Sequence, residues 1–220
     1  MKTPLTLIFD LDGTLIDSKP GILACFRHTF DVLHMECPSD AVLTASIGQP
    51  FRQAMASLLE TTDSAAVERA VGIYRERYST VGLYEASVFA GVPEFLAAVD
   101  GRPLYVATSK AAVFAERVLT HFGLSGHFQG IFGPDLKGQP AGKVELLRRL
   151  LRDEQIGGPA AMIGDRAEDM HAAAANRVLP LGVSWGYGAE RELLDAGAAA
   201  VCRAPDELLS YAREFRGTPG

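Results

Sequence analysis

The sequence has few cysteines, no long apolar run and no cluster of basic residues. Its three cysteines, Cys25, Cys37 and Cys202, form no CxxC pair, and their odd number argues against a disulfide framework. We therefore expect a reducing, cytoplasmic compartment. No stretch reaches the roughly 18 apolar residues of a membrane span. Because Asp10 and Asp12 interrupt the first apolar run, we expect no signal peptide either.

The charge of the chain is acidic overall and spread along its length. The formal net charge is −6, and no segment is dominated by lysine and arginine, so we expect no nucleic-acid partner. A protein of this charge that handles an anionic substrate needs positive charge concentrated locally, as a bound cation or a few placed basic side chains. The 220 residues, 48% of them hydrophobic, suffice for one sizeable domain or for a core domain with a small second one.

The second half of the chain alternates between strand and helix patterns. We expect strands at 102–108, 130–132, 160–164, 178–184 and 198–202, and helices at about 111–121, 143–151, 167–175, 189–196 and 205–215. This alternation predicts an α/β fold with a parallel sheet covered on both faces. Ligands of such sheets bind beyond the carboxyl ends of the strands.

The first half breaks this rhythm. A strand pattern ends at Asp10, and the next one begins only near residue 103, while residues 17 to about 85 carry apolar residues at helical spacing. A single crossover needs one helix, and several are expected here. We therefore predict a helical cap domain over 17–85, inserted into a core formed by 1–16 and 86–220.

Two aspartates, in the stretch DLDGT, follow the first apolar strand. Asp-Gly is a common turn pair, so a plain turn is one interpretation. A calcium-binding loop counted from Asp10 fails, because its sixth position is Leu15 and its twelfth is Gly21. The third interpretation is catalytic: Asp10 attacks a phosphorus atom, and Asp12 on the same side handles the proton.

A second acidic group, in the stretch IGDRAEDM, also follows an apolar strand. Asp165 and Glu168 have the spacing of a capping box, which is a purely structural interpretation. Such a cap does not require Asp169. Together with the first two aspartates, Asp165 and Asp169 would place four carboxylates in one pocket, where a cation has to offset their repulsion. Mg²⁺ fits, because it takes carboxylates and retains waters that phosphate oxygens replace.

Hydroxyl and lysine side chains follow the other predicted strands. Thr108 and Ser109 end the second core strand, where they either cap the next helix or bind phosphate oxygens. Lys143 begins the helix after the third core strand, against the preference of a helix start for negative charge. Lys110 and Lys137 are alternatives for the same role.

Two other motif matches do not lead to a function. The stretch GVSWG fits the elbow of serine hydrolases, but all five histidines precede Ser184, so the required order fails. The stretch GYGAER lacks the third glycine of a dinucleotide-binding loop. No GxxxxGK[ST] is present, which argues against a P-loop.

The apolar strand ending in DxDGT, the strand-end threonine, the downstream lysine and GDxxxD occur in an order that resembles the haloacid dehalogenase (HAD) superfamily. The helices directly after the first motif resemble its phosphoglycolate-phosphatase-like branch. The resemblance covers nearly the whole chain and implies a Rossmann-like α/β core with an inserted α-helical cap. It departs from many relatives at residues 138–143, GQPAGK, where they have Lys-Pro.

The resemblance also implies roles for individual residues. Asp10 would be the nucleophile and Asp12 the general acid and base. Thr108 would bind phosphate, with Ser109 beside it, and Lys143 would neutralise phosphate and nucleophile.

The implied metal site has four contributors. Asp165 would hold Mg²⁺ together with the Asp10 carboxylate and the Asp12 backbone carbonyl, and Asp169 would support it. The implied cofactor is therefore Mg²⁺, and the implied substrate is a small phosphate ester.

Several functions stay open on the sequence alone. We expect a Mg²⁺-dependent phosphatase for a phosphoglycolate-like compound or a nucleoside monophosphate, with Gln49 and Arg52 of the cap setting specificity. A phosphomutase and a non-catalytic binding protein of the same fold are the alternatives. A dehalogenase is disfavoured, because that chemistry has no need of Asp12. The oligomeric state is expected to be a monomer or a homodimer.

Overall fold

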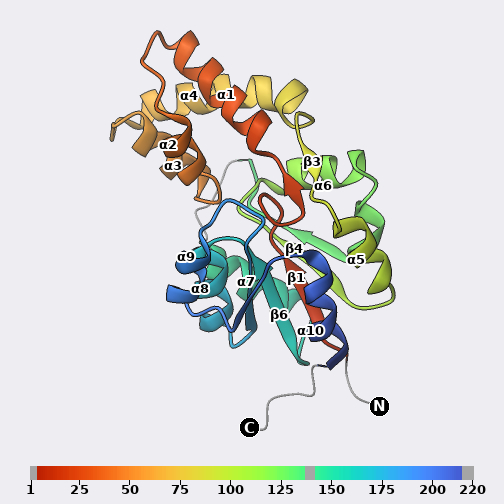
Figure 1. The fold of residues 1–220 in the computed structure, drawn as a ribbon. Coiled ribbons are helices and arrows are strands. Elements are labelled where there is room, and N and C mark those ends of the chain that lie inside the picture. The colour runs from red at the N-terminus through yellow and green to blue at the C-terminus, as the bar shows by residue number, and fades with distance from the viewer. Residues whose placement is uncertain (1–3, 137–141, 215–220) are drawn as a thin grey trace.

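The core is a single parallel sheet. The computed structural model describes residues 4–136 and 142–214. In that part of the chain, six parallel strands follow the order β5-β4-β1-β6-β7-β8 (Figure 1). They are β1 (Thr6–Phe9), β4 (Leu104–Ala107), β5 (Gly130–Phe132), β6 (Ala160–Gly164), β7 (Leu179–Val183) and β8 (Ala200–Cys202). The predicted α/β class and parallel sheet are therefore confirmed.

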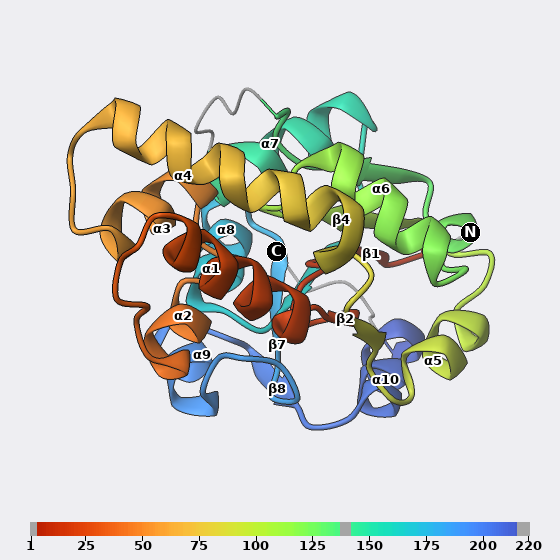
Figure 2. The ribbon, with the colours of Figure 1, turned by 90° about the horizontal axis from the view of Figure 1, so that it is seen from above.

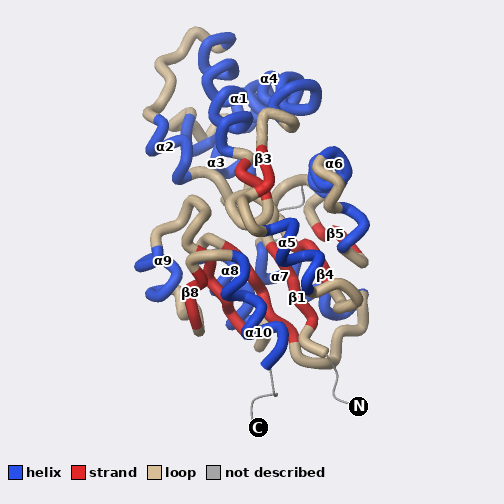
Figure 3. Tube along the Cα trace, turned by 45° about the vertical axis from the view of Figure 1, so that its right-hand side comes forward, coloured by secondary structure: helices blue, strands red, loops and turns tan. Residues whose placement is uncertain are grey.

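Helices cover both faces of this sheet, because alternate residues of each buried strand point to opposite sides. Leu7 and Phe9 of β1 belong to the apolar cluster that includes helices α5 (Val92–Ala98), α6 (Ala112–His121) and α10 (Leu208–Glu214). Ile8 belongs to the cluster on the other face, with α7 (Lys143–Asp153) and α8 (Ala167–Ala175). Helix α9 (Glu190–Asp195) lies beside β7 and β8. Figure 3 shows the strands as a central layer among these helices.

A helical cap stands over the carboxyl-end edge of the sheet (Figures 1 and 2). It contains α1 (Lys19–Val32), α2 (Asp40–Ala45), α3 (Phe51–Leu58), α4 (Ser64–Arg77) and a π-helical turn η1 (Tyr78–Gly82). Its core is built from residues that recur at helical spacing and turn inward: Phe26, Phe30, Met55, Val71 and Tyr74. The Asp63 carboxylate begins α4 by accepting the Ala65 N–H at 2.9 Å. The predicted insertion of several helices is confirmed.

Some elements were not predicted. The cap is joined to the core by two short antiparallel strands, β2 (Ile16–Asp17) and β3 (Ser87–Val88), which we call the hinge. Strands of two residues and the seven-residue helix α5 are too short to give a periodic signal. The predicted helix over 205–215 divides into a 3₁₀ turn, η3 (Pro205–Glu207), and α10. A further 3₁₀ turn, η2 (Ser125–His127), precedes β5.

The structure also bears on two of the opening expectations. Within residues 4–136 and 142–214, no helix combines the length and the apolar character needed to cross a membrane. Cys25, Cys37 and Cys202 are free thiols.

Candidate active site

Three neighbouring strands deliver polar side chains to one edge of the sheet. Asp10 follows β1, Thr108 follows β4 and Asp165 follows β6, and β4 and β6 flank β1. Because the strands are parallel, their carboxyl ends lie at the same edge, and these three residues meet there. All three are buried.

Three of the predicted carboxylates form a compact cluster. Oxygen atoms of Asp10, Asp165 and Asp169 lie within 4.8 Å of one another, and all three residues are buried. Within the described part of the chain, Asp10 Oδ1 accepts no hydrogen bond. A buried carboxylate oxygen without a donor is costly, so this atom calls for a cation or a reaction partner.

Lys143 neutralises part of this negative charge. Its Nζ lies 2.7 Å from Asp10 Oδ2 and also contacts Asp169 Oδ1. Its side chain is only 4% exposed. Burial alone lowers the pKa of Lys143, but the two carboxylates outweigh it, and the net shift is upward, so the ammonium keeps its charge. Of the two described lysines considered from the sequence, Lys143 contacts Asp10 and Lys110 contacts Asp12. Lys137 lies outside the described residues.

The remaining negative charge raises the pKa values of two carboxyl groups in the cluster. Burial and the Asp10 carboxylate raise the pKa of Asp165 to about 7. Burial, with further repulsion from Asp10 and Asp165, raises the pKa of Asp169 despite its ion pair with Lys143. Oxygen ligands, high negative charge and the free Asp10 Oδ1 together fit a hard divalent cation. That the ion is Mg²⁺ stays a prediction.

Glycine is required in the turn after the two aspartates. Gly13 has φ +86°, which side-chain-bearing residues rarely adopt, and a Cβ there would collide with the Asp165 carboxylate. The next residue, Thr14, donates its hydroxyl to Asp165 Oδ1 at 3.3 Å. The turn interpretation of DLDGT is therefore correct for its backbone, and the turn also contacts Asp165.

Asp12 has a separate environment from the carboxylate cluster. Its Oδ1 lies 2.5 Å from Lys110 Nζ and also accepts the hydroxyl hydrogen of Ser18. Lys110 Nζ in turn lies 5.5 Å from the ring centroid of Tyr78 in the cap. The two lysines thus divide their contacts, with Lys143 on Asp10 and Lys110 on Asp12. The predicted role of the Asp12 backbone carbonyl in metal binding stays a prediction.

The capping arrangement differs from the one expected for GDRAED. The N-cap of α8 is Arg166, and its N–H donates to Asp169 Oδ2 at 3.1 Å. The capping-box interpretation with Asp165 and Glu168 does not describe this helix start, which uses Arg166 and Asp169 instead. Helix α8 begins at Ala167, as predicted. Asp165 is held by Tyr187, whose backbone N–H donates to Asp165 Oδ2 at 2.8 Å. Asp169 contributes to both the helix start and the carboxylate cluster.

The two predicted phosphate-binding hydroxyls lie at the start of the loop after β4. Thr108 is buried, and its Oγ1 accepts the Lys110 N–H at 3.2 Å, so it orders the loop rather than the first turn of α6. The N-cap of α6 is Ala111. Ser109 lines the cavity described next.

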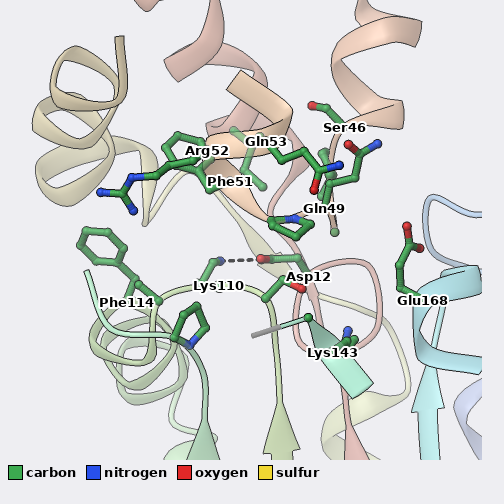
Figure 4. Close-up of a pocket in the computed structure, with 18 of the residues that line it drawn as sticks. Asp12, Ser46, Gln49, Phe51, Arg52, Gln53, Lys110, Phe114, Lys143 and Glu168 are labelled. Carbon is green, nitrogen blue, oxygen red and sulfur yellow. Dashed lines mark hydrogen bonds and ion pairs between the residues drawn. The ribbon is translucent and has the colours of Figure 1, made fainter. Parts of the chain in front are cut away.

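A cavity of about 720 Å³ separates the cap from the core (Figure 4). Asp12, Lys110 and Lys143 line its core side, and Gln49 and Arg52 line its cap side. Figure 4 shows Lys110 pointing at Asp12 beneath Gln49, Arg52 and Phe51. Much of the remaining wall is aromatic, from Phe26, Phe51, Tyr74, Tyr78 and Phe114. Gln49 and Arg52 were thus correctly expected at this cavity; their role in specificity stays a prediction.

Arginine side chains tie the cap to the core around this cavity. Arg166 Nη1 donates to the Ile47 carbonyl at 3.1 Å, and Arg75 Nη1 donates to the Leu136 carbonyl at 2.8 Å. No sequence signal pointed to these residues or to Ser18 and Tyr187. Ser18 closes the stretch that carries the two aspartates, whereas Tyr187 lies in the stretch GYGAER, which matches no complete motif.

The raised pKa of Asp165 predicts how cation affinity depends on pH. A metal ligand must be deprotonated, so binding to the metal-free protein displaces a proton whenever Asp165 is protonated. We expect the apparent Kd for Mg²⁺ to level off above pH 7, the pKa of Asp165 being about 7. Below that pH it should rise about tenfold per pH unit. Isothermal titration calorimetry across this range measures it. Asp165→Asn should bind weakly at every pH, and a pH-independent wild-type affinity would contradict the assignment.

Comparison with known proteins places this arrangement in a family. Residues 7–183 match the model of the haloacid dehalogenase-like hydrolases. The chain is 42% identical over 190 residues to a 5'-nucleotidase of Pseudomonas aeruginosa, covering 85% of this chain and 86% of that protein. It is 28% identical over 192 residues to a phosphoglycolate phosphatase of Xanthomonas campestris, again covering 85% and 86%.

A relative of different activity has the same core. The chain is 37% identical over 190 residues to the tyrosine-protein kinase PtkA of Mycobacterium tuberculosis, covering 85% of this chain but only 64% of that protein.

Among solved structures, a Clostridium acetobutylicum protein described as a predicted phosphatase superposes with a TM-score of 0.89 at 30% identity, covering 97% of this chain and all of the other. The resemblance inferred from DxDGT and GDxxxD is confirmed: the chain belongs to the haloacid dehalogenase-like hydrolases.

Proposed function

We propose that this protein is a Mg²⁺-dependent phosphatase that hydrolyses a small phosphorylated metabolite through an aspartyl phosphate on Asp10. The observation that carries the proposal is that Asp10 and Asp12 have different partners. Asp10 has one oxygen fixed by Lys143 and the other without a donor, whereas Asp12 is held apart from it by Lys110 and faces the cavity. One carboxylate is thus free to attack, and the other is placed to move a proton.

In the first step, Asp10 Oδ1 forms a bond to phosphorus as the ester P–O bond breaks. Asp12 gives a proton to the departing oxygen, so the leaving group departs as an alcohol. Thr108 and Ser109, at the start of the loop after β4, would hold phosphate oxygens through a hydroxyl and backbone N–H groups. Asp10 and the phosphate are both negatively charged and repel each other. The Lys143 ammonium offsets this repulsion as the two come together.

A Mg²⁺ ion held by Asp10 and Asp165, with Asp169 in support, would when bound offset the charge of the phosphate oxygens. In the second step, a water oxygen attacks phosphorus, the bond to Asp10 breaks, and Asp12 takes the proton from that water. Asp10 is thereby regenerated and inorganic phosphate leaves. The cap, inserted at about 17–85, limits the access of water before the first step and contacts the leaving group.

The cavity favours one of the two expected substrate classes. Phosphoglycolate is a two-carbon acid without an aromatic part, and it would leave most of a 720 Å³ space unfilled. A nucleoside monophosphate brings a flat, largely apolar base that suits the rings of Phe51, Tyr74 and Phe114. We therefore expect nucleoside monophosphates to be the better substrates.

A screen of phosphorylated metabolites with Mg²⁺ tests the function. We expect phosphate release from nucleoside monophosphates at a higher kcat/KM than from phosphoglycolate. Product analysis in the same assay separates hydrolysis, which yields inorganic phosphate, from the mutase alternative, which yields an isomeric phosphate ester. Absence of turnover on the whole panel would support the non-catalytic binding protein.

The position of Arg52 predicts an effect on substrate choice. Its guanidinium is paired with Glu68 at the cap wall of the cavity, and Figure 4 shows it directed away from Asp12 and Lys143. Arg52→Ala should therefore change the order of kcat/KM values across the panel, with turnover of the best remaining substrate kept within about tenfold. Arg69→Ala, an exposed arginine on the same helix as Glu68, is the matched control. An unchanged order in Arg52→Ala would remove this residue from the specificity surface.

A further inference from the structure

The loop of residues 184–188, SWGYG, packs directly on the candidate active site. Besides the Tyr187 N–H on Asp165, the Trp185 indole N–H donates to the Thr14 carbonyl at 3.0 Å. A Cβ at Gly186 would overlap both the Gly13 carbonyl and the Asp165 side chain, so the loop approaches as closely as a backbone can. This loop therefore touches both acidic motifs at once.

The hydroxyl of Tyr187 lies at the hinge between core and cap. It accepts the N–H of Ser18 at 2.8 Å and that of Lys19 at 3.0 Å, and it donates to Asp17 Oδ1 at 3.0 Å. Burial and the nearby carboxylates of Asp12 and Asp17 raise the pKa of Tyr187, so the hydroxyl remains a donor. One side chain thus organises the last residue of β2 and the start of α1.

The Ser18 hydroxyl is directed to a catalytic candidate rather than to the helix that it precedes. It is the N-cap residue of α1, where a serine normally accepts an N–H of the helix, but its side chain makes no capping hydrogen bond. Its hydroxyl is directed to Asp12 instead. A serine at this position would accept the N–H of the second or third helical residue, but Pro20 has none and the Gly21 N–H donates to the Glu85 carbonyl at 2.9 Å. Ser18 is therefore free to hold the carboxylate, while the Tyr187 oxygen fixes the backbone of Ser18 and Lys19.

We propose that Tyr187 is a positioning residue for proton transfer: it fixes the hinge so that the Ser18 hydroxyl holds Asp12 within reach of the leaving-group oxygen. This inference rests on the proposed function, because it concerns the step assigned to Asp12. Tyr187 itself exchanges no proton with the substrate. Its hydroxyl acts through Ser18, and its backbone N–H acts separately on Asp165.

The test compares two phosphate esters that differ in their need for a proton. An alkyl ester, the best nucleoside monophosphate of the panel, has a leaving group that needs Asp12; p-nitrophenyl phosphate has one that departs as a stable anion. Tyr187→Phe should lower kcat/KM for the alkyl ester about tenfold or more and change p-nitrophenyl phosphate by less than about threefold. The ratio kcat/KM reports the first step only, so the later role of Asp12 with water does not enter.

Four companion variants make the result specific. Ser18→Ala should show the same selective loss, and the double variant should lose no more than either single one, because both act on one contact. Asp12→Asn should show the selective loss in larger form. Tyr105→Phe removes a hydroxyl bonded to Glu154 at 3.2 Å, outside the residues of the site, and should leave both esters unchanged. The Kd for Mg²⁺ should be unchanged in Tyr187→Phe, since the contact with Asp165 comes from the backbone.

The outcomes separate this inference from the proposed function. Equal losses on both esters in Tyr187→Phe and Ser18→Ala, or no loss on either, would overturn the positioning role while leaving the phosphatase intact. If the wild-type enzyme with Mg²⁺ turns over neither ester, the proposed function fails, and the inference fails with it. Should Tyr187→Phe not fold, Ser18→Ala alone decides between these results.

Discussion

Replacing Asp10 with asparagine is expected to abolish turnover, with kcat falling roughly 10⁴-fold or more, as when a covalent nucleophile is removed from other enzymes. The substitution keeps the size of the side chain but replaces the charged oxygen that would attack phosphorus with a neutral amide. Steady-state rates on the best substrate of the panel, with Mg²⁺ present, measure the effect.

The fold should survive this change, because Lys143 keeps its second partner, Asp169. Circular dichroism and the melting temperature check that point. Asp195→Asn is the matched control, since this carboxylate is 60% exposed and paired with Arg191 on the surface, and its loss should leave kcat unchanged. A tenth or more of wild-type activity in Asp10→Asn would refute the aspartyl-phosphate mechanism.

Replacing Lys143 with methionine is expected to destabilise the metal-free protein by about 3–5 kcal/mol, the usual effect of removing one partner from a buried ion pair. The change leaves Asp10, Asp165 and Asp169 buried without their cationic neighbour. Denaturant unfolding with chelator present measures the loss. Activity should fall as well, because no other ammonium contacts Asp10 among the described residues.

Two companion measurements test the electrostatic origin of this effect. Lys143→Arg keeps the charge and should lose less stability than Lys143→Met. Adding Asp169→Asn to Lys143→Met removes one of the stranded charges and should restore part of the stability. If the double variant is less stable than Lys143→Met, simple loss of packing explains the result better than unpaired charge does.

Much of the candidate site was predictable from the sequence, since local signals determine it. Asp10, Thr108 and Asp165 each come directly after an apolar strand, and parallel strands bring such positions to one edge. The alternation of strands and helices likewise predicted the fold class, because buried parallel strands need long apolar runs and helical crossovers. These inferences depend on sequence neighbours and a general rule of sheet geometry.

Other features depend on contacts between distant segments and left no local signal. The sequence could not tell which lysine meets Asp10, because Lys110 and Lys143 both follow core strands. The start of α8 at Ala167 was predicted, but its capping partners were not: Arg166 and Asp169 form the cap, and Asp165 accepts the backbone N–H of Tyr187, far along the chain. A capping pattern is local, whereas competition for one carboxylate is decided by the tertiary structure.

The sequence by itself thus determined the fold class, the inserted cap and the identity of the acidic residues at the sheet edge. Only the tertiary structure decided the pairing of Lys143 with Asp10 and of Lys110 with Asp12, the aromatic wall of the cavity, and the contacts of Tyr187 with the hinge. The physical reason is the range of the interactions. Strand and helix periodicity acts over a few residues, while ion pairs and hydrogen bonds between loops form wherever the packed elements bring them together.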